Sequence, residues 1–205
     1  MKNIRISKNW KDAENVIKDK GIVVAPTDTL YGILGDALDK EVVERVYLIK
    51  NRKPDKPYII LIPDVSFLSL FGIKPDIYEK RLLENRGITV ILSVPPETED
   101  RYQYLHRGGK TLAFRIPDKK ELLTLLKRVN RPLIAPSANP ENKPPARDIS
   151  EAVSYFGGDI DLYIDEGVIK NKKPSTIVKI SKGKPVVLRE GSTSISQINH
   201  ILKIK

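Results

Sequence analysis

The amino-acid sequence predicts an α/β protein whose sheet, twisted and flanked by helices, mixes parallel and antiparallel strands. Short aliphatic and β-branched runs alternate with segments in which apolar residues recur every three or four positions, as in strands followed by amphipathic helices. The last strand-like runs follow one another without helices between them, which disfavours a purely parallel, doubly wound sheet. No internal repeat or low-complexity tract divides the 205 residues, so we expect a single domain over residues 1–205.

The N-terminal half contains the first three predicted strands. Apolar residues at helical spacing from Trp10 to Ile17 predict a helix that ends before Gly21. The apolar run at residues 22–25 predicts a buried strand, which Pro26 ends. The other elements expected up to residue 94 are a helix beginning near residue 39, short helices over 64–70 and 76–84, and strands over 58–62 and 88–94.

The C-terminal half is predicted to begin with a loop rich in Pro and Gly, over residues 95–110. A second loop, rich in Pro and Asn, is expected over residues 136–147. The expected strands lie near residues 111–116, 132–135, 161–164, 175–180 and 186–188, and the expected helices near 122–129, 150–156 and the C-terminus.

Composition narrows the class of protein. Lys and Arg total 36 against 26 Asp and Glu, a net charge of +10 that favours anionic partners such as nucleotides or RNA. The absence of cysteine excludes disulfides, thiolate metal sites and cysteine nucleophiles, and it fits a reducing compartment. The N-terminus lacks the apolar run of a signal peptide, and no stretch approaches ~18 consecutive apolar residues. We therefore expect a cytoplasmic protein without a membrane partner.

Several common catalytic motifs are missing. Gly109-Lys110-Thr111 resembles the end of a phosphate-binding P-loop, but Tyr104 stands where that motif needs glycine, and a strand rather than a helix is expected to follow. No G-x-G-x-x-G dinucleotide motif occurs. The only histidines, His106 and His200, are too few for a histidine metal cluster and make a Ser-His-Asp triad improbable.

Polar residues follow two predicted strands, at the strand ends where α/β proteins commonly bind ligands. Thr27 and Thr29 lie directly after the strand at 22–25, where their hydroxyls could contact a ligand or where Asp28 could simply cap a turn. Ser137 and Asn139 follow the strand at 132–135 and suit a phosphate or ribose, although a turn explains them nearly as well.

Four cations raise the same question. Lys50 and Arg52 suit a polyphosphate, but they also suit the C-terminal end of a helix, where positive charge is favourable. Arg115 and Arg189 lie in apolar strands, and an arginine among apolar neighbours requires an anionic partner.

Six short segments, in this order, resemble the YrdC/Sua5 family of threonylcarbamoyl-AMP synthases. They are PTDTLYG (26–32), KNR (50–52), FRIP (114–117), SAN (137–139), PSTIV (174–178) and LREG (188–191). The resemblance runs from Gly21 to about Ser192 and is closest to the short, single-domain form. It implies a YrdC-like fold and a nucleotidyltransferase that joins L-threonine, bicarbonate and ATP into threonylcarbamoyl-adenylate and pyrophosphate, with Mg²⁺ on the phosphates. Other proteins would then transfer the threonylcarbamoyl group to a tRNA adenosine (the t6A modification), and tRNA itself is a candidate partner.

The resemblance also implies roles for individual residues. Lys50 and Arg52 would act catalytically by neutralising the phosphates. The rest of the nucleotide site would comprise Thr111, Ser137, Asn139 and Arg189. The threonine site would comprise Thr27, Thr29, Tyr31, Arg115 and Ser175, with Arg115 on the threonine carboxylate.

The sequence departs from the family pattern near the expected threonine pocket. Leu61 stands where many members have histidine, and Ala135 and Pro136 stand where a threonine is common. Two other functions remain open on sequence alone. The positive charge also fits a non-enzymatic module that binds tRNA or double-stranded RNA. The domain could alternatively make a carbamoyl-adenylate, as the related domain of hydrogenase-maturation proteins does, although the zinc fingers of those longer chains require cysteine.

Overall fold

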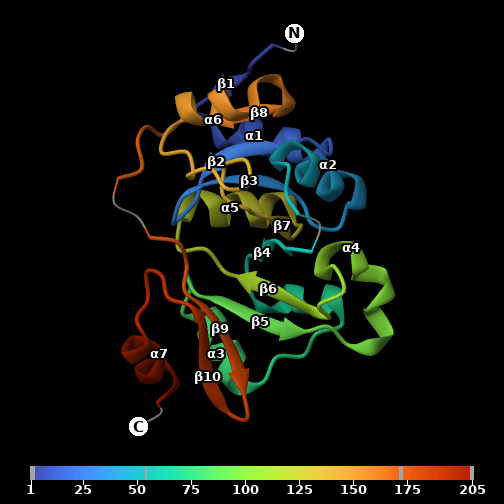
Figure 1. Cartoon of the computed structure of the whole chain (residues 1–205), viewed down its shortest axis with the longest axis vertical. Helices are drawn as coiled ribbons and strands as arrows, with labels where there is room; N and C mark the ends of the chain where they lie inside the picture. The colour runs from blue at the N-terminus through green and yellow to red at the C-terminus, as the bar shows by residue number, and fades with distance from the viewer. Residues whose placement is uncertain (1–2, 54, 171–172, 204–205) are drawn as a thin grey trace.

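The computed structural model describes residues 3–53, 55–170 and 173–203. Over this part of the chain, ten strands form one continuous sheet in the order β1-β8-β2-β3-β7-β4-β6-β5-β9-β10 (Figure 1). The strands are β1 (Ile6–Ser7), β2 (Val23–Pro26), β3 (Tyr31–Asp36), β4 (Ile59–Leu61), β5 (Thr89–Ser93), β6 (Thr111–Arg115), β7 (Leu133–Ile134), β8 (Leu162–Ile164), β9 (Ile177–Ser181) and β10 (Lys184–Arg189).

The sheet is mixed, which confirms the predicted fold class. Strand β8 runs parallel to β1 and β2, and the pairs β4–β6 and β5–β9 are also parallel. The pairs β2–β3, β3–β7, β4–β7, β5–β6 and β9–β10 are antiparallel. The final hairpin, β9–β10, has no helix between its strands, as the sequence predicted.

Helices flank the sheet on both faces. They are α1 (Trp10–Lys18), α2 (Lys40–Lys50), α3 (Ile77–Glu84), α4 (Gln103–His106), α5 (Lys120–Val129), α6 (Ile149–Phe156) and α7 (Ile195–Leu202), with 3₁₀ turns at Val65–Phe71, Pro96–Thr98, Asp100–Tyr102 and Gly157–Asp159. Several helices begin where the sequence supplies caps: the Asp39 carboxylate accepts the backbone N–H groups of Glu41 and Val42, and Asp76 forms a capping box with Glu79.

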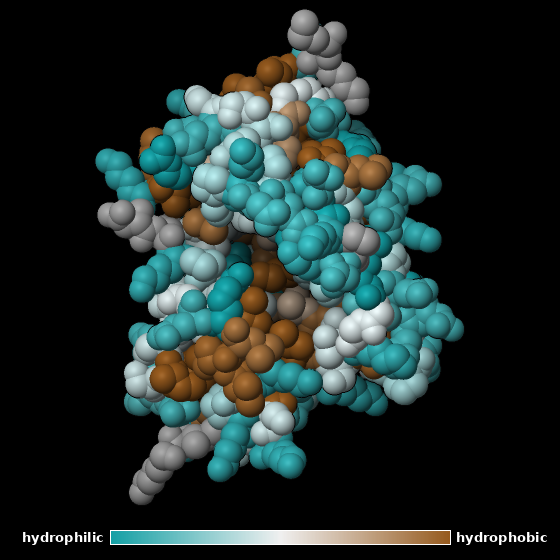
Figure 2. Space-filling model, viewed as in Figure 1, coloured by the Kyte–Doolittle hydropathy of each residue, from teal (hydrophilic) through white to brown (hydrophobic). Residues whose placement is uncertain are grey.

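One face of the sheet is covered by helices over only part of its area. Helices α1 and α5 pack on it through apolar stripes such as Leu122, Leu126 and Val129, together with Leu34, Leu61 and Leu133 from β3, β4 and β7. Strands β5, β6, β9 and β10 contribute nothing to this core cluster. Figure 2 shows apolar residues gathered in and below a hollow between the two halves of the molecule.

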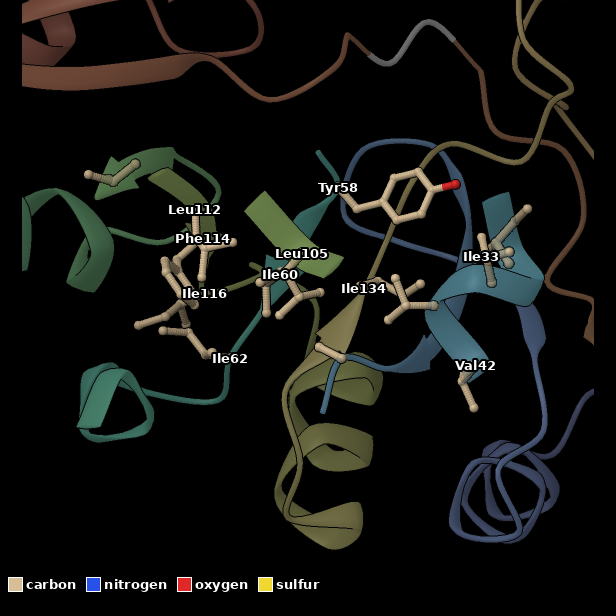
Figure 3. Close-up of a cluster of buried hydrophobic side chains, with 14 of the residues drawn as sticks. Ile33, Val42, Tyr58, Ile60, Ile62, Leu105, Leu112, Phe114, Ile116 and Ile134 are labelled. Carbon is tan, nitrogen blue, oxygen red and sulfur yellow. The ribbon is translucent and has the colours of Figure 1, made fainter. Parts of the chain in front are cut away.

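The opposite face buries a larger core, part of which Figure 3 shows. Phe71 and Phe114 meet edge to face within it, with their ring centroids 5.0 Å apart, and Ile60, Ile62, Leu112 and Ile134 belong to the same cluster. Strand β6 therefore alternates: Leu112 and Phe114 enter this core, while Thr111, Ala113 and Arg115 face the other way. The alternation places Arg115 on the partly uncovered face.

The structure corrects the sequence prediction in several places, among them the following. Residues 31–36, which the sequence analysis left without an element, form the fully buried strand β3. Gly35 belongs there because a Cβ would lie 2.6 Å from Val42 Cγ1, so the strand needs glycine to approach α2. The predicted loop at 95–110 contains α4 and two 3₁₀ turns, and the predicted helix over 64–70 is a 3₁₀ helix. None of the described helices has the length and apolar character needed to cross a membrane.

Candidate functional site

A cavity of about 540 Å³ opens on the partly uncovered face of the sheet. It lies where the β2–β3 turn, the start of β4, the end of β6 and the start of β9 meet the loop after β7. Eight of the residues predicted for the site line it: Thr27, Thr29, Tyr31, Arg52, Arg115, Ser137, Ser175 and Arg189. The other three, Lys50, Thr111 and Asn139, do not line it.

The turn between β2 and β3 is held by the Thr27 hydroxyl. Thr27 Oγ1 donates to the Leu30 carbonyl at 2.7 Å and accepts the backbone N–H groups of Thr29 and Leu30 at 3.1 and 3.2 Å. It also lies 3.1 Å from Thr29 Oγ1. Gly32, on the returning strand, is close enough to Thr27 that a Cβ would lie 3.0 Å from its methyl carbon. The threonines therefore shape a tight turn at the wall of the cavity.

Arg115 is held in place beneath this turn. Its side chain is 5 % exposed, and NH2 donates to Asp28 Oδ1 at 2.8 Å, while NH1 donates to Thr29 Oγ1 at 3.3 Å. Asp28 also accepts the Asp118 N–H at 3.1 Å. Burial lowers the pKa of the Arg115 guanidinium, and Asp28 opposes that shift. The Nε atom of Arg115 is buried without a hydrogen-bond partner among the described residues, whereas NH1 and NH2 are used on Thr29 and Asp28.

Asp28 is a residue at the cavity that the sequence analysis considered only as a possible turn cap. Its ion pair with Arg115 joins positions 87 residues apart. The sequence did indicate that Arg115 needs an anionic partner, because it lies in an apolar strand, but it did not indicate which residue provides the anion.

Ser175 and Arg189 form a second polar cluster, next to Thr89, the residue that pairs with Arg115 across β5 and β6. Ser175 is fully buried, and its hydroxyl lies 2.8 Å from Thr89 Oγ1. Arg189 donates through NH2 to the Ser175 carbonyl at 2.9 Å and to its hydroxyl at 3.3 Å. Thr176 accepts the N–H groups of Gly191 and Thr193, each at 3.0 Å, and so ties β9 to the segment after β10. The PSTIV and LREG segments are therefore one structural unit.

The loop after β7 is held against β3 by backbone bonds and by Lys50. Ile33 N donates to the Pro136 carbonyl and Ala138 N to the Tyr31 carbonyl, both at 2.8 Å. Lys50, which is 1 % exposed, reaches under this loop, and its Nζ donates to the carbonyl oxygens of Ser137, at 2.5 Å, and Asn139. Burial, with the nearby charge of Arg52, lowers the pKa of Lys50 to about 7.

The side chains of this loop also bond to one another. Ser137 Oγ donates to Asn139 Oδ1 at 2.5 Å, and Asn139 Nδ2 donates to the carbonyls of Pro140 and Lys143. Asn139 is thus used within the loop, whereas Ser137 also lines the cavity. Lys50 and Asn139 shape the wall from behind.

Arg52 lies on the segment that leads from α2 to β4. Its Nε donates to the Lys56 carbonyl at 3.0 Å and its NH2 to the Pro57 carbonyl at 3.3 Å. The guanidinium also lies over the Tyr58 ring, 5.0 Å from its centroid. The Tyr58 hydroxyl is buried without a hydrogen-bond partner among the described residues, and Tyr58 lines the cavity. Figure 3 shows the ring of Tyr58 above Ile134 and Ile60.

The remaining predicted residues occupy distinct places. Tyr31 lines the cavity, but its hydroxyl donates to the Gly167 carbonyl at 2.8 Å, and burial raises the pKa of that hydroxyl to about 12. Thr111 lies at the far end of β6 from Arg115, opposite Ser93. Leu61 is fully buried in the core beneath α5 and does not line the cavity, whereas Ala135 and Pro136 do.

The charged groups on the cavity wall are all positive. Among the described residues, the charged side chains that line it are the guanidinium groups of Arg52, Arg115 and Arg189, and no carboxylate of this part of the chain lines it. Serine and threonine hydroxyls lie between them, and Leu30, Ile59 and Ile177 supply an apolar floor. Such a wall binds an elongated anion that also carries apolar groups.

A family model for Sua5, YciO and YrdC proteins, described as telomere recombination, matches residues 15–191. The threonylcarbamoyl-AMP synthase of Pyrococcus abyssi is 32 % identical over 200 residues, which cover 94 % of this chain and 57 % of that protein. The synthase of Bacillus subtilis is 29 % identical over 195 residues, covering 93 % of this chain and 55 % of the relative. This chain therefore spans little more than half the length of these curated relatives.

The fold of this chain also matches a solved structure of one of these relatives. The structure of Pyrococcus abyssi Sua5 in complex with L-threonine matches with a TM-score of 0.86 and 26 % identity. The match covers 97 % of this chain and 60 % of that one.

Proposed function

The chain belongs to the Sua5/YciO/YrdC family, and from that membership we propose that it is a threonylcarbamoyl-AMP synthase. Its substrates are L-threonine, bicarbonate and ATP, and its products are threonylcarbamoyl-adenylate and pyrophosphate. The Pyrococcus abyssi and Bacillus subtilis relatives are threonylcarbamoyl-AMP synthases, which supports this assignment, as does the threonine complex of the former.

The observation that carries the proposal is the cavity with three guanidinium groups and no carboxylate on its wall. Each substrate is an anion or carries an anionic group: threonine has a carboxylate, bicarbonate is itself an anion, and ATP has a triphosphate. The threonine amine combines with bicarbonate to form the carbamate with loss of water. A carbamate oxygen then attacks the α-phosphorus, and pyrophosphate leaves. This chemistry needs positioning and charge neutralisation rather than a protein nucleophile.

The amino acid would lie against the β2–β3 turn. Arg115 is oriented by Asp28 and lines the cavity, where its guanidinium would bind the threonine carboxylate. Thr27, Thr29 and Ser175 would offer hydroxyl groups to threonine, and Tyr31 would contribute to the wall. Ala135 and Pro136 line the same cavity and would contribute to amino-acid selectivity, whereas Leu61 is buried away from it.

The nucleotide would lie against the other walls. Arg52 and Arg189 would neutralise phosphates, and Ser137 would donate a hydroxyl hydrogen bond. Lys50 and Asn139 would act by fixing the loop that carries Ser137, with Lys50 adding a buried positive charge behind it. Thr111, on the cavity side of β6 but at its far end, would meet the part of the nucleotide most distant from Arg115.

Magnesium would enter with the nucleotide. Among the described residues, no three His, Asp or Glu side chains gather as a metal site. Mg²⁺ commonly keeps its waters and binds through substrate phosphates, so a wall of hydroxyl groups without carboxylates fits an ion carried by ATP. The ion would add charge stabilisation to the phosphates.

The test is product formation by the purified protein. Mg·ATP, bicarbonate and L-threonine should yield threonylcarbamoyl-adenylate, identified by mass spectrometry, with one pyrophosphate per adenylate. Omitting threonine or bicarbonate should abolish both products, and serine should replace threonine poorly. Pyrophosphate release that needs no amino acid would contradict the proposal. Salt-sensitive tRNA binding by a folded protein without any adenylate would favour a non-enzymatic RNA-binding module.

A further inference from the structure

Glu141, which lies outside the six sequence segments described above, joins the segment that carries Arg52 to the loop that carries Ser137 through hydrogen bonds. Its Oε2 accepts the backbone N–H of Lys53 at 2.6 Å, and its Oε1 accepts Lys56 Nζ. Its own backbone N–H donates to the Lys50 carbonyl at 2.9 Å. One residue thus contacts both ends of the segment that follows α2.

Lys56 connects Glu141 to the Arg52 guanidinium. Lys56 binds Glu141 through its side chain, while its carbonyl accepts Arg52 Nε at 3.0 Å and the Tyr47 hydroxyl at 2.8 Å. Arg52 receives no carboxylate partner among the described residues, so its place depends on the carbonyls of Lys56 and Pro57 and on the Tyr58 ring. Fixing Lys56 therefore fixes Arg52.

The Glu141 side chain is only 10 % exposed, although its partner Lys56 is 48 % exposed. The Lys56 side chain and the Lys53 backbone lower the pKa of Glu141, so the carboxylate is ionised near neutral pH. Because Lys56 neutralises it, Glu141 can stand beside a phosphate site without repelling a triphosphate strongly.

We infer that Glu141 is a positioning residue for the nucleotide, acting through Lys56 to hold Arg52 at the distance from Ser137 that a bound phosphate requires. The inference rests on the proposed function, because it assigns Arg52 to the phosphates of ATP. It adds a determinant of nucleotide affinity that does not contact the nucleotide.

The test compares Glu141→Gln with Glu151→Gln, a matched control on α6. Glu151 also accepts a backbone N–H, from Arg147 at 2.9 Å, and the Arg147 side chain at 2.5 Å. Neither Glu151 nor Arg147 lines the cavity. The probe is Mg·α,β-methylene-ATP, titrated calorimetrically, with L-threonine titrated separately and folding checked by circular dichroism.

We expect Glu141→Gln to weaken binding of the analogue about three- to tenfold, the range for one partly exposed, charge-assisted contact. Threonine affinity and the Glu151→Gln control should stay at the wild-type values. In an Arg52→Ala background, Glu141→Gln should cause no further loss, because Glu141 acts through Arg52.

Three outcomes would overturn the inference. In the first, Glu141→Gln binds the analogue like wild type. In the second, the loss is the same with and without Arg52, which would mean that Glu141 acts independently of it. In the third, threonine and analogue affinities fall together, which indicates a general structural role. A wild-type protein that binds threonine but not the analogue would instead refute the proposed synthase function, and this inference with it.

Discussion

The two sides of the cavity hold their arginines differently. Arg115 lies under the β2–β3 turn with a side chain that is 5 % exposed, and it forms a buried ion pair with Asp28. Arg52 lies on a connecting segment, and its described partners are backbone carbonyls and an aromatic ring. Arg115 is thus part of the packed fold, whereas the charge of Arg52 is left largely uncompensated for a ligand. Under the proposed function, the amino-acid side would therefore be preformed, and the phosphate side would gain its counter-charge from ATP.

This contrast is tested most strongly by removing the partner of Arg115. Asp28→Ala would leave a buried guanidinium without its carboxylate and should lower the free energy of unfolding by about 3–5 kcal/mol. Urea denaturation measures the change. Asp118→Ala, at a side chain that is 73 % exposed, is the control and should stay within about 0.5 kcal/mol of wild type. A loss below about 1 kcal/mol for Asp28→Ala would mean that Arg115 is not fixed by this pair.

The buried Lys50 behind the phosphate side should make stability depend on pH. The pKa of lysine in the unfolded chain is 10.5, and burial lowers the pKa of Lys50 to about 7 in the folded protein. Between these values the unfolded state binds more protons, so the free energy of unfolding should rise with pH, by up to about 1.4 kcal/mol per pH unit. Unfolding of wild type and Lys50→Met at pH 7.5 and 9 measures this slope, which the variant should lose. Equal slopes would show that Lys50 does not titrate in this range.

The smallest expected change in stability concerns the two stacked tyrosines on the phosphate side. Tyr47 and Tyr58 have ring centroids 4.3 Å apart. The Tyr47 hydroxyl donates to the Lys56 carbonyl, whereas the Tyr58 hydroxyl has no hydrogen-bond partner in the described part of the chain. Tyr47→Phe should therefore cost about 1 kcal/mol of stability, whereas Tyr58→Phe should be neutral or slightly stabilising. Thermal unfolding of both variants makes the comparison. If Tyr58→Phe is the more destabilising change, its hydroxyl has a partner within the fold.

Local patterns predicted most of the fold. Alternation of apolar residues placed β6 and put Arg115 on one face of it, and helical periodicity placed α1, α2 and α5. Strand β3 was missed because Gly32 and Gly35 look like turn residues, although the fold needs them where backbone approaches Thr27 and Val42. Sequence patterns report a residue's own conformational preference, and they do not report how close a neighbour will lie.

Eight of the residues predicted for the site line one cavity, but the contacts between them did not follow from the sequence. Arg115 was expected to need an anion, but its partner, Asp28, is 87 residues away. Likewise, nothing near Lys50 shows that its side chain will turn inward to two carbonyl oxygens. The Glu141–Lys56 ion pair joins residues 85 positions apart. Such pairings arise only when the sheet brings distant loops together.

The most direct test of the two-sided cavity is a crossed binding measurement. L-threonine and Mg·α,β-methylene-ATP would each be titrated into wild type, Arg52→Ala and the double variant Asp28→Asn/Arg115→Gln, which removes the buried pair without leaving an unpaired charge. We predict that Arg52→Ala loses affinity for the nucleotide analogue and keeps its affinity for threonine. The double variant should show the reverse. Equal losses of both ligands in both variants would contradict the division of the cavity into an amino-acid side and a phosphate side.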